Sequence, residues 1–403
     1  MSMRWKGAVI PTPPTVVGPV GGEGGSASGA WTLQTQLQYA GVDGWPKPLI
    51  PRQLWSWGYN VYGMLGLGNT TSYNSPMQVG ALTNWLSVSC GYNQTVSIKT
   101  DRTLWSWGWN NLGQLGLGNT TFYSSPKQVG ALTNWSSVSC GGYHTVSIKT
   151  DGTLWSWGRN ANGQLGLGNV TYYSSPKQVG ALTNWSSISC GANHTVSIKT
   201  DGTLWSWGYN SFGQLGQGNI TNLSSPKQVG ALTNWLSVAC GLYHTVSTKT
   251  DGTLWSWGYN AQGQLGIGNQ VNRSSPNQVG ALTNWLSVSC GRYHTVSIKT
   301  DGTLWSWGYN NFGQLGRGNT VDYSSPKQVG ALTNWLSVSC GLYHTVSIKT
   351  DGTLWSWGYN SNGQLGLGNG TNYSSPKQVG ALTSWAKLFT GYGPNSTVAI
   401  KSS

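Results

Sequence analysis

The stretch Cys190–Gly218 reads CGANHTVSIKTDGTLWSWGYNSFGQLGQG, and it contains the pattern that decides the fold. Its centre, Leu-Trp-Ser-Trp-Gly, recurs every 50 residues along the chain, beginning at Leu54, Leu104, Leu154, Leu204, Leu254, Leu304 and Leu354. The repeats fill the chain from Leu54 to Ser403. Recurring units of about 40–50 residues are typical of propeller blades, so the period, and not the length, indicates the domain organisation.

We expect four short antiparallel strands in each unit and name them A to D; in one unit they are Trp285–Cys290, Thr295–Thr300, Thr303–Gly308 and Lys327–Val329. Strand B alternates with a period of two, and Asp301-Gly302 is a hairpin signal between strands B and C. Strand D follows Pro326. A proline and a lysine there suit an outer edge, because both discourage pairing with other chains.

The phase of the repeat predicts how the ring closes. The repeat region begins with strands C and D (Leu54–Val79) and ends with strands A and B (Trp385–Lys401). Six blades are therefore contiguous, and the seventh combines two N-terminal with two C-terminal strands. The predicted fold is all-β: a seven-bladed β-propeller of four-stranded blades over residues 54–403, preceded by an extended N-terminal arm over residues 1–53.

The motif Cys-Gly-x-x-His-Thr-Val, followed by Asp-Gly-Thr-Leu-Trp-Ser-Trp-Gly-x-Asn-x-x-Gly-Gln-Leu-Gly-x-Gly, resembles the regulator of chromosome condensation repeat. The resemblance covers about 350 of the 403 residues and implies a seven-bladed propeller. The family's nuclear members are nucleotide exchange factors that use insertions, a wedge and a basic tail. A bacterial relative inhibits β-lactamases through an aromatic loop face. No unit here carries such an insertion, and the fold alone does not assign a function.

The charge of the chain is low in density and evenly spread. Charged residues make up 8% of the sequence, against about 25% in ordinary soluble domains. The net charge is +13, but one lysine per repeat (Lys127, Lys177, Lys227, Lys327, Lys377) distributes it around a ring. Because a nucleic-acid interface needs clustered charge, we do not expect nucleic-acid binding. No apolar run is long enough to span a membrane, and no secretory signal is evident.

The cysteines and histidines occupy repeated positions. Cys90, Cys140, Cys190, Cys240, Cys290 and Cys340 are copies of one position, so we expect buried free thiols and no disulfides. His144, His194, His244, His294 and His344 belong to the repeat motif, and Gln94 replaces one of them. We expect these histidines to be hydrogen-bonded struts of the blades. No catalytic, metal-binding or cofactor-binding pattern is present, so the sequence indicates a protein that binds and does not catalyse.

Differences among the repeats point to one face as the working surface. The B–C and D–A turns hardly vary, whereas the A–B and C–D loops do, and in an up-and-down blade these loops leave on the same side. Aromatic and arginine residues are enriched in binding hot spots. The predicted binding residues are Tyr62, Tyr73, Trp109, Phe122, Tyr123, Arg159, Tyr172, Tyr173, Phe212, Tyr243, Arg273, Arg292, Phe312, Arg317 and Tyr323. The alternative is neutral drift, which also concentrates variation in loops.

We expect the first 53 residues to form an extended arm. Residues 1–30 are rich in Pro, Gly and Ser, and a short helix is expected from Thr32 to Tyr39. The segment GGSASGAWTLQTQLQYAGVDGWP resembles N-terminal segments of tailed-bacteriophage structural proteins, which implies an anchor at Trp31, Leu33, Trp45 and Pro46. We therefore expect a virion appendage (a fibre, neck or capsid-surface protein) that contacts other virion proteins through its arm and a host-surface glycan or protein through its loops. The alternatives are a secreted inhibitor or lectin-like binder, and a nucleotide exchange or chromatin-binding regulator.

Overall fold

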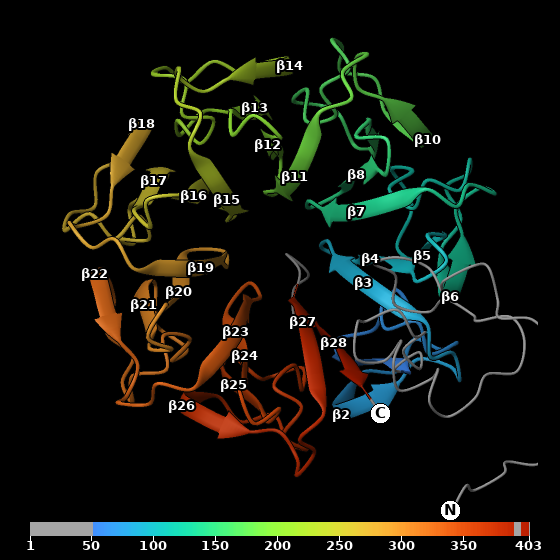
Figure 1. Ribbon diagram of the computed structural model, residues 1–403. Helices are drawn as coiled ribbons and strands as arrows, with labels where there is room; N and C mark the ends of the chain where they lie inside the picture. Colours follow the sequence, from blue (N-terminus) through green and yellow to red (C-terminus); the bar gives the residue numbers. More distant parts are fainter. Residues whose placement is uncertain (1–50, 391–395, 403) are drawn as a thin grey trace, which may run out of the picture. The chain divides into compact units, whose positions relative to one another are not determined.

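The described residues from Arg52 to Ser402 form a closed ring of seven antiparallel sheets with four strands each (Figure 1). The structure, a computed structural model, describes residues 51–390 and 396–402. The expected helix at 32–39 and the anchor residues of the arm lie outside this described part. The predicted seven-bladed, all-β architecture is confirmed.

Six blades each consist of four consecutive strands. The first three are β3–β6 (Trp85–Cys90, Gln94–Lys99, Leu104–Gly108, Tyr123–Gln128), β7–β10 (Trp135–Cys140, His144–Lys149, Leu154–Gly158, Tyr173–Gln178) and β11–β14 (Trp185–Cys190, His194–Lys199, Leu204–Gly208, Leu223–Gln228). The next three are β15–β18 (Trp235–Cys240, His244–Lys249, Leu254–Gly258, Arg273–Gln278), β19–β22 (Trp285–Cys290, His294–Lys299, Leu304–Gly308, Tyr323–Gln328) and β23–β26 (Trp335–Cys340, His344–Lys349, Leu354–Gly358, Tyr373–Gln378). In each, strand A lies nearest the central opening and strand D lies at the outer edge (Figure 1).

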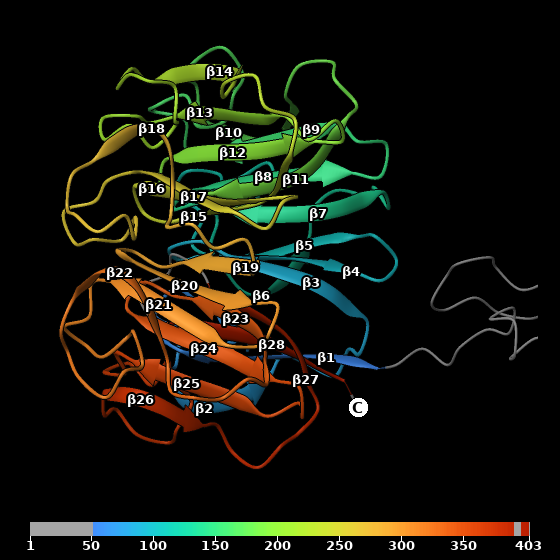
Figure 2. The ribbon, with the colours of Figure 1, turned by 60° about the vertical axis from the view of Figure 1, so that its left-hand side comes forward.

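The seventh blade joins the two ends of the repeat region, as the phase predicted. Its strand order is β2-β1-β28-β27, where β1 is Arg52–Gly58, β2 is Tyr73–Gln78, β27 is Trp385–Thr390 and β28 is Ser396–Ser402. Every residue of β1 pairs with β28 in unbroken register, from Arg52↔Ser402 to Gly58↔Ser396. The start of β1 and the C-terminal end of β28 therefore emerge on the same side of the ring (Figure 2).

Strand D differs from the prediction. It was expected over Lys327–Val329, but β22 spans Tyr323–Gln328 and includes Pro326. Its register against β21 shifts between Ser306 and Gly308, so the strand is irregular there. Pro326 has no backbone N–H to donate to a neighbouring strand. It is tolerated because β22 is an edge strand that is irregular at this point, so no interstrand hydrogen bond is lost. Residues 323–328 show no apolar alternation that would predict a strand. They form β22 because β21 offers free backbone groups with which they pair.

The hydrophobic core lies between blades and not within them. One cluster joins Val96, Ile98 and Leu104 of one blade to Trp135, Cys140 and Trp157 of the next. Equivalent clusters recur around the ring. A four-stranded sheet cannot bury both faces alone, so each blade depends on its neighbours.

Hydrogen bonds from the repeat motif join successive blades. Trp157 Nε1 donates to Gln114 O of the preceding blade at 2.9 Å, and Trp57 Nε1 closes the ring on Gln364 O at 3.0 Å. Gly116 has a φ of +73°, and a Cβ there would lie 2.7 Å from Trp157 Nε1, so the glycine of Gln-Leu-Gly is required.

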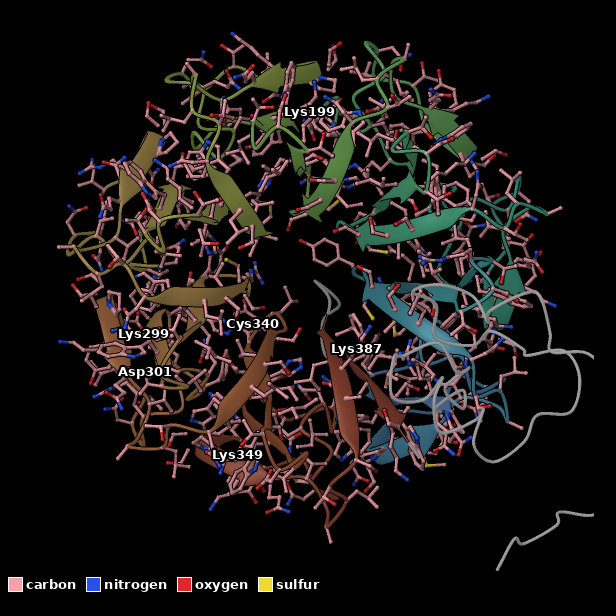
Figure 3. All side chains as sticks on the ribbon, in the orientation of Figure 1. Lys199, Lys299, Asp301, Cys340, Lys349 and Lys387 are labelled. Atoms are coloured by element: carbon pink, nitrogen blue, oxygen red, sulfur yellow. The ribbon has the colours of Figure 1, made fainter. Side chains whose placement is uncertain are left out.

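The histidines and cysteines lie at the same junctions, as expected. His144 Nε2 is 3.0 Å from Thr195 Oγ1 of the next blade, and His344 makes the equivalent contact with Thr397. The six cysteines are free and buried; Cys340 Sγ donates to Ser289 O of the preceding blade at 3.5 Å. Figure 3 shows Cys340 near the central opening and Lys199, Lys299 and Lys349 farther out.

The ring has two unlike faces. We call the side with the A–B loops (91–93 and equivalents) and C–D loops (59–72 and equivalents) the loop face. The opposite side, with the B–C turns (100–103) and D–A turns (79–84), is the turn face. Arg52 N donates to Thr83 O in a D–A turn at 2.7 Å, so the chain enters the propeller at the turn face.

Candidate binding face

Aromatic rings line the loop face in two arcs, which together we call the aromatic belt; all of them are half-buried except Phe122, which is exposed. The long arc consists of Tyr209, Phe212, Tyr243, Tyr259, Tyr293, Tyr309, Phe312, Tyr343 and Tyr359. The short arc consists of Tyr62, Tyr92, Trp109, Phe122 and Tyr143.

The long arc is continuous because rings from one blade pack on rings from the next. Tyr209, just after β13, contacts Tyr243 in the following A–B loop at 5.9 Å between centroids. Phe212 lies 5.1 Å from Tyr243 and 4.9 Å from Tyr259. Along the arc the centroid distances run from 4.8 to 6.5 Å, which is the range in which edge-to-face and tilted pairs are favourable. The rings therefore hold one another in place.

The short arc repeats this geometry around a tryptophan. Trp109 stands where most units have tyrosine, and it lies 4.9 Å from Tyr143 and 6.1 Å from Phe122. Tyr62 contacts both Trp109 and Phe122, at 6.4 and 6.0 Å. Phe122 is 40% exposed, so this arc offers an open aromatic surface to solvent.

The A–B loops of several blades contribute to the inner part of the loop face. Tyr92 packs over Gly142, where a Cβ would lie 2.8 Å from Tyr92 Cε2. Arg292 donates to the hydroxyl of Tyr343 at 2.5 Å, and its guanidinium lies 5.0 Å from the Tyr293 ring centre. Burial raises the pKa of Tyr92 above its usual range, and Tyr243 adds to this while Arg292 opposes it.

A polar gap separates the two arcs on one side. Arg159 occupies the position of Trp109 and Tyr209 in its own unit, and its Nη1 donates to Asn193 Oδ1 at 3.3 Å.

Burial raises the pKa of Tyr143, Tyr243 and Tyr343, so these phenols stay neutral. The loop face therefore combines neutral aromatic rings with the cations Arg159 and Arg292.

The structure brings some of the predicted residues together and separates others. The residues in or against the aromatic belt are Tyr62, Trp109, Phe122, Phe212, Tyr243, Arg292 and Phe312. Tyr73, Tyr123, Tyr173, Arg273 and Tyr323 are the first residues of outer strands and lie at the rim. Tyr172 is exposed in its loop, and Arg317 lines a groove between two blades.

The rim tyrosines are engaged with their own blade. Tyr323 accepts from Asn319 Nδ2 at 3.1 Å, and Tyr73 accepts from Asn69 at the same distance. The outer lysines lie beside these rings, as for Lys127, whose Nζ is 5.5 Å from the Tyr123 ring centre. This agrees with the expectation that the lysine ring marks the outer edge of the sheets.

Sequence reasoning missed much of the aromatic belt. It selected residues that vary between repeats, whereas Tyr209, Tyr259, Tyr309 and Tyr359 repeat at one position. The sequence contained a signal for these residues, because tyrosine recurs directly after the Trp-Gly of strand C. That position is the start of a loop, where an aromatic residue is not needed to fill the core. A repeated residue can belong to a repeated surface as well as to the scaffold.

The belt can stack against flat, partly apolar ligands, because aromatic rings attract C–H groups through the negative charge of their faces. In the described ranges, 51–390 and 396–402, no cluster of three or more His, Cys, Asp or Glu is placed to hold a metal. Within those ranges no helix has the length and apolarity that crossing a membrane requires.

Comparison with known proteins identifies a family model and solved structures that share this fold. The family model for the RCC1-like domain matches residues 53–399. The structure of human WBSCR16 superposes with a TM-score of 0.78 at 23% identity, covering 87% of this chain and 99% of that one. Yeast RCC1 (Prp20) bound to Kap60 gives a TM-score of 0.78 at 20% identity, with 88% and 89% covered.

A further structure, Prp20p from Saccharomyces cerevisiae, was described together with its binding to Gsp1p and histones. It also gives a TM-score of 0.78 at 20% identity, with 88% of this chain and 92% of that one covered. Identities this low show a shared fold alone. A search of curated protein sequences gives no match.

Proposed function

We propose that this chain, which belongs to the RCC1-like domain family, is a non-catalytic attachment protein. In this proposal it binds a host-surface glycan through its loop face. The observation that carries the proposal is the aromatic belt. Its rings are preorganised by mutual packing, so little conformational entropy is lost when a ligand stacks on them. The phenol hydroxyls add donors and acceptors that can meet sugar hydroxyls.

The polarity of the ring supports display on a larger assembly. The strand β1 begins at the turn face, where Arg52 pairs with Ser402. The loop face, which carries the belt, is the opposite side of the propeller, and we propose that the residues before Arg52 fix the chain to a particle. We propose that the particle is a virion and that the chain is a fibre, neck or capsid-surface appendage. This part of the proposal rests on the resemblance to tailed-bacteriophage structural proteins that we infer for the N-terminal segment from its sequence alone.

Binding of a protein is the second candidate, with the chain acting as a secreted inhibitor. Arg292, held between Tyr293 and Tyr343, favours it, because arginine and tyrosine dominate the hot spots of protein interfaces.

The experiment is a glycan array probed with the full chain and with the variant Tyr259→Ala/Tyr309→Ala. The matched control is Leu132→Ala/Leu182→Ala, which alters two turn-face leucines that are each 48% exposed. We expect the belt variant to lose its glycan signals by at least about tenfold, since stacking on one aromatic side chain is worth about 1–3 kcal/mol in the related case of a nucleic-acid base. The control should bind as the parent does. Equal binding by the belt variant would refute the choice of face.

The assembly role has its own test. Mass spectrometry of purified particles from a virus that encodes this chain should detect it, and a deletion of residues 1–50, which leaves β1 complete, should be absent from the particles. Incorporation of the deleted form at the parental level would overturn the anchor role without affecting the glycan result.

A further inference from the structure

Two arginines bring positive charge to the inner part of the loop face, and each is an exception to its own repeat. Arg292 lies in an A–B loop, at the position of Leu242 and Leu342 in two other units. Arg159 begins a C–D loop, where the other six units have tyrosine or tryptophan. Both side chains are half-buried. The blades form in the other units without these arginines, so the scaffold does not require either of them.

Acidic side chains are kept away from these two arginines. Six of the seven acidic residues in the described part of the chain lie in the B–C turns of the turn face, namely Asp101, Asp151, Asp201, Asp251, Asp301 and Asp351. The seventh, Asp322, directly precedes the outer strand β22 and accepts from Asn310 N at 2.7 Å. Within residues 51–390 and 396–402, the side-chain acceptors of Arg159 and Arg292 are an amide and a phenol, not a carboxylate. Because both acceptors are neutral, the positive charge of the loop face is not compensated.

Arg292 is held in position by tyrosines near the central opening. Its Nη1 donates to the Tyr343 hydroxyl at 2.5 Å, and its guanidinium carbon lies 5.0 Å from the ring centre of Tyr293 and 5.3 Å from that of Tyr343. Its backbone N donates to Leu342 O in the next A–B loop at 3.2 Å. Its Nε is buried, so a ligand must approach the Nη groups. A cation fixed in this way loses little conformational entropy when it binds an anion.

Arg159 reaches the same part of the loop face from another blade. Burial raises the pKa of Tyr243, and Tyr293 and Tyr209 add to the rise. Arg292 and Arg159 both oppose it. Ions in the solvent screen partly exposed charges beyond about 8–10 Å, so an effect of both arginines on one phenol indicates that both guanidinium groups lie near it. The two cations therefore converge on one ring of the aromatic belt.

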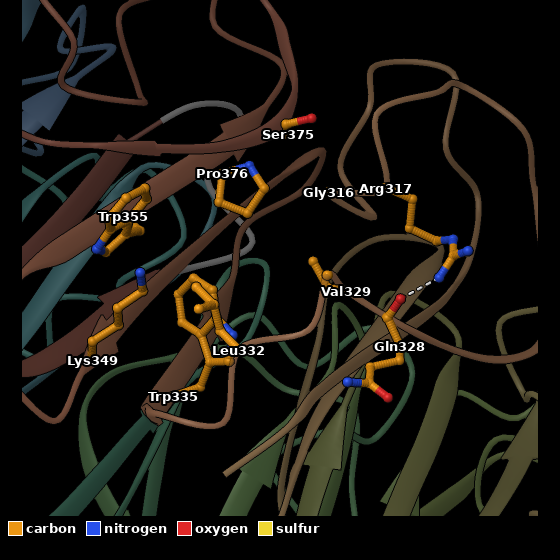
Figure 4. A pocket seen from close by; sticks show the side chains of 11 residues that line it. Gly316, Arg317, Gln328, Val329, Leu332, Trp335, Lys349, Trp355, Ser375 and Pro376 are labelled. Atoms are coloured by element: carbon orange, nitrogen blue, oxygen red, sulfur yellow. Dashed lines mark hydrogen bonds between the residues drawn. The ribbon is translucent and has the colours of Figure 1, made fainter.

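The other arginines among the varied loop positions are placed elsewhere. Arg317 lies in a groove between two blades, where its Nη1 donates to Gln328 O of its own blade (Figure 4). Arg273 is the first residue of the outer strand β18. Of these four arginines, Arg159 and Arg292 are the pair that acts on tyrosines of the aromatic belt.

From this arrangement we infer that the glycan bound by the loop face is an acidic oligosaccharide. Its carboxylate or sulfate groups pair with Arg292 and Arg159, and its sugar rings stack on the aromatic belt. A guanidinium presents paired N–H groups that match the oxygens of a carboxylate or of a tetrahedral oxyanion, and such charge-assisted hydrogen bonds are roughly twice as strong as neutral ones. The inference rests on the proposed function, because it names the ligand class of the same face.

The test compares charged and neutral forms of the same sugar by calorimetry with the full chain. The probes are hexagalacturonate and its methyl ester for carboxylates, and a sulfated carrageenan oligosaccharide and its desulfated form for sulfates. We expect the parent to bind the charged form of at least one pair about tenfold more tightly than the neutral form, a difference of about 1.4 kcal/mol. The pair that shows the preference identifies the anionic group. The preference should shrink at high salt, because salt screens partly exposed charges.

The variant Arg292→Leu/Arg159→Tyr removes both cations. It introduces residues that the chain already uses at these positions in other units, such as Leu242 and Tyr209, so we expect it to fold, and its melting temperature checks this. It should bind the charged and neutral forms equally. The matched control is Arg102→Gly, which removes an exposed cation of the turn face and should keep the preference.

Equal binding of the charged and neutral forms by the parent, or a preference that survives in Arg292→Leu/Arg159→Tyr, would overturn the inference. Loss of the preference in Arg102→Gly would also overturn it, because net charge alone would then explain the result. If the parent binds both forms equally and Tyr259→Ala/Tyr309→Ala loses both, the inference fails and the proposed function stands. If no glycan binds to the parent at all, the proposed function fails as well.

Discussion

Acidification should unfold the propeller through its buried histidines. Burial lowers the pKa of His144, His194, His244, His294 and His344 from 6.5 to about 3. The unfolded chain therefore binds more protons than the folded one between these two values. Because the folded pKa is depressed, the stabilisation is complete above about pH 6.5 and is lost as the pH falls toward 3.

The size of the effect follows from these values. Between pH 7 and pH 5 each histidine should cost about 2 kcal/mol of unfolding free energy, and the five together about 10 kcal/mol. The whole stability of a folded domain is about 5–15 kcal/mol, so most of it should be gone near pH 5. The slope of stability against pH below 6 should approach about 7 kcal/mol per unit, the value for five protons.

The assay is urea unfolding followed by tryptophan fluorescence at several pH values. The control residue is already in the chain: Gln94 replaces histidine in one blade, and its Nε2 still reaches the next blade at Gly141 O, at 3.2 Å. His194→Gln should therefore fold and should lower the slope by one proton, about 1.4 kcal/mol per pH unit. Stability that stays flat from pH 7 to 5, or a slope unchanged in His194→Gln, would refute the reasoning.

Three further predictions concern the repeat itself. Arg102 has a φ of +63° where other units have glycine, so Arg102→Gly should raise the unfolding free energy by about 1–2 kcal/mol in urea titration, and Gly152→Ala should lower it. Gly116→Ala should lower the melting temperature, because its Cβ would lie 2.7 Å from Trp157 Nε1; an unchanged value would contradict the close packing of blades. Burial raises the pKa of the cysteines, for Cys340 to about 12, so stability should fall as the pH rises above 9, and Ellman's reagent should label the thiols only after unfolding.

Much of the fold was predictable because the same motif occurs seven times in the sequence. The Trp-Ser-Trp-Gly strands, the B–C turns and the closing of β1 on β28 follow from the spacing and phase of one motif. The outer strand was predicted less well. Residues 323–328 contain a proline and no apolar alternation, so only the neighbouring β21 determines that they pair.

The candidate site was predictable in part for a different reason. Comparing repeats separates constant from varied positions, and it selected Trp109, Phe212 and Phe312, whose rings pack in the aromatic belt. It cannot recognise a surface that is itself repeated, so Tyr259 and Tyr309 were passed over. It also cannot tell a loop tip from the start of an outer strand, which is why Tyr73 and its equivalents were predicted as binding residues of the loops although they begin outer strands.

The pairing of β1 with β28 has a mechanical consequence. Tension applied through residue 51 while the loop face is held would run along the axis of β1. Interstrand hydrogen bonds lie perpendicular to the strands, so this direction of pull shears all of them at once and does not peel them one by one. The contacts from Arg52↔Ser402 to Gly58↔Ser396 would share the force. Pulling the two termini apart would instead separate the same strands one hydrogen bond at a time, starting from Arg52↔Ser402. The pairing of β1 with β28 should therefore withstand a larger force applied between residue 51 and the loop face than one applied between the chain ends.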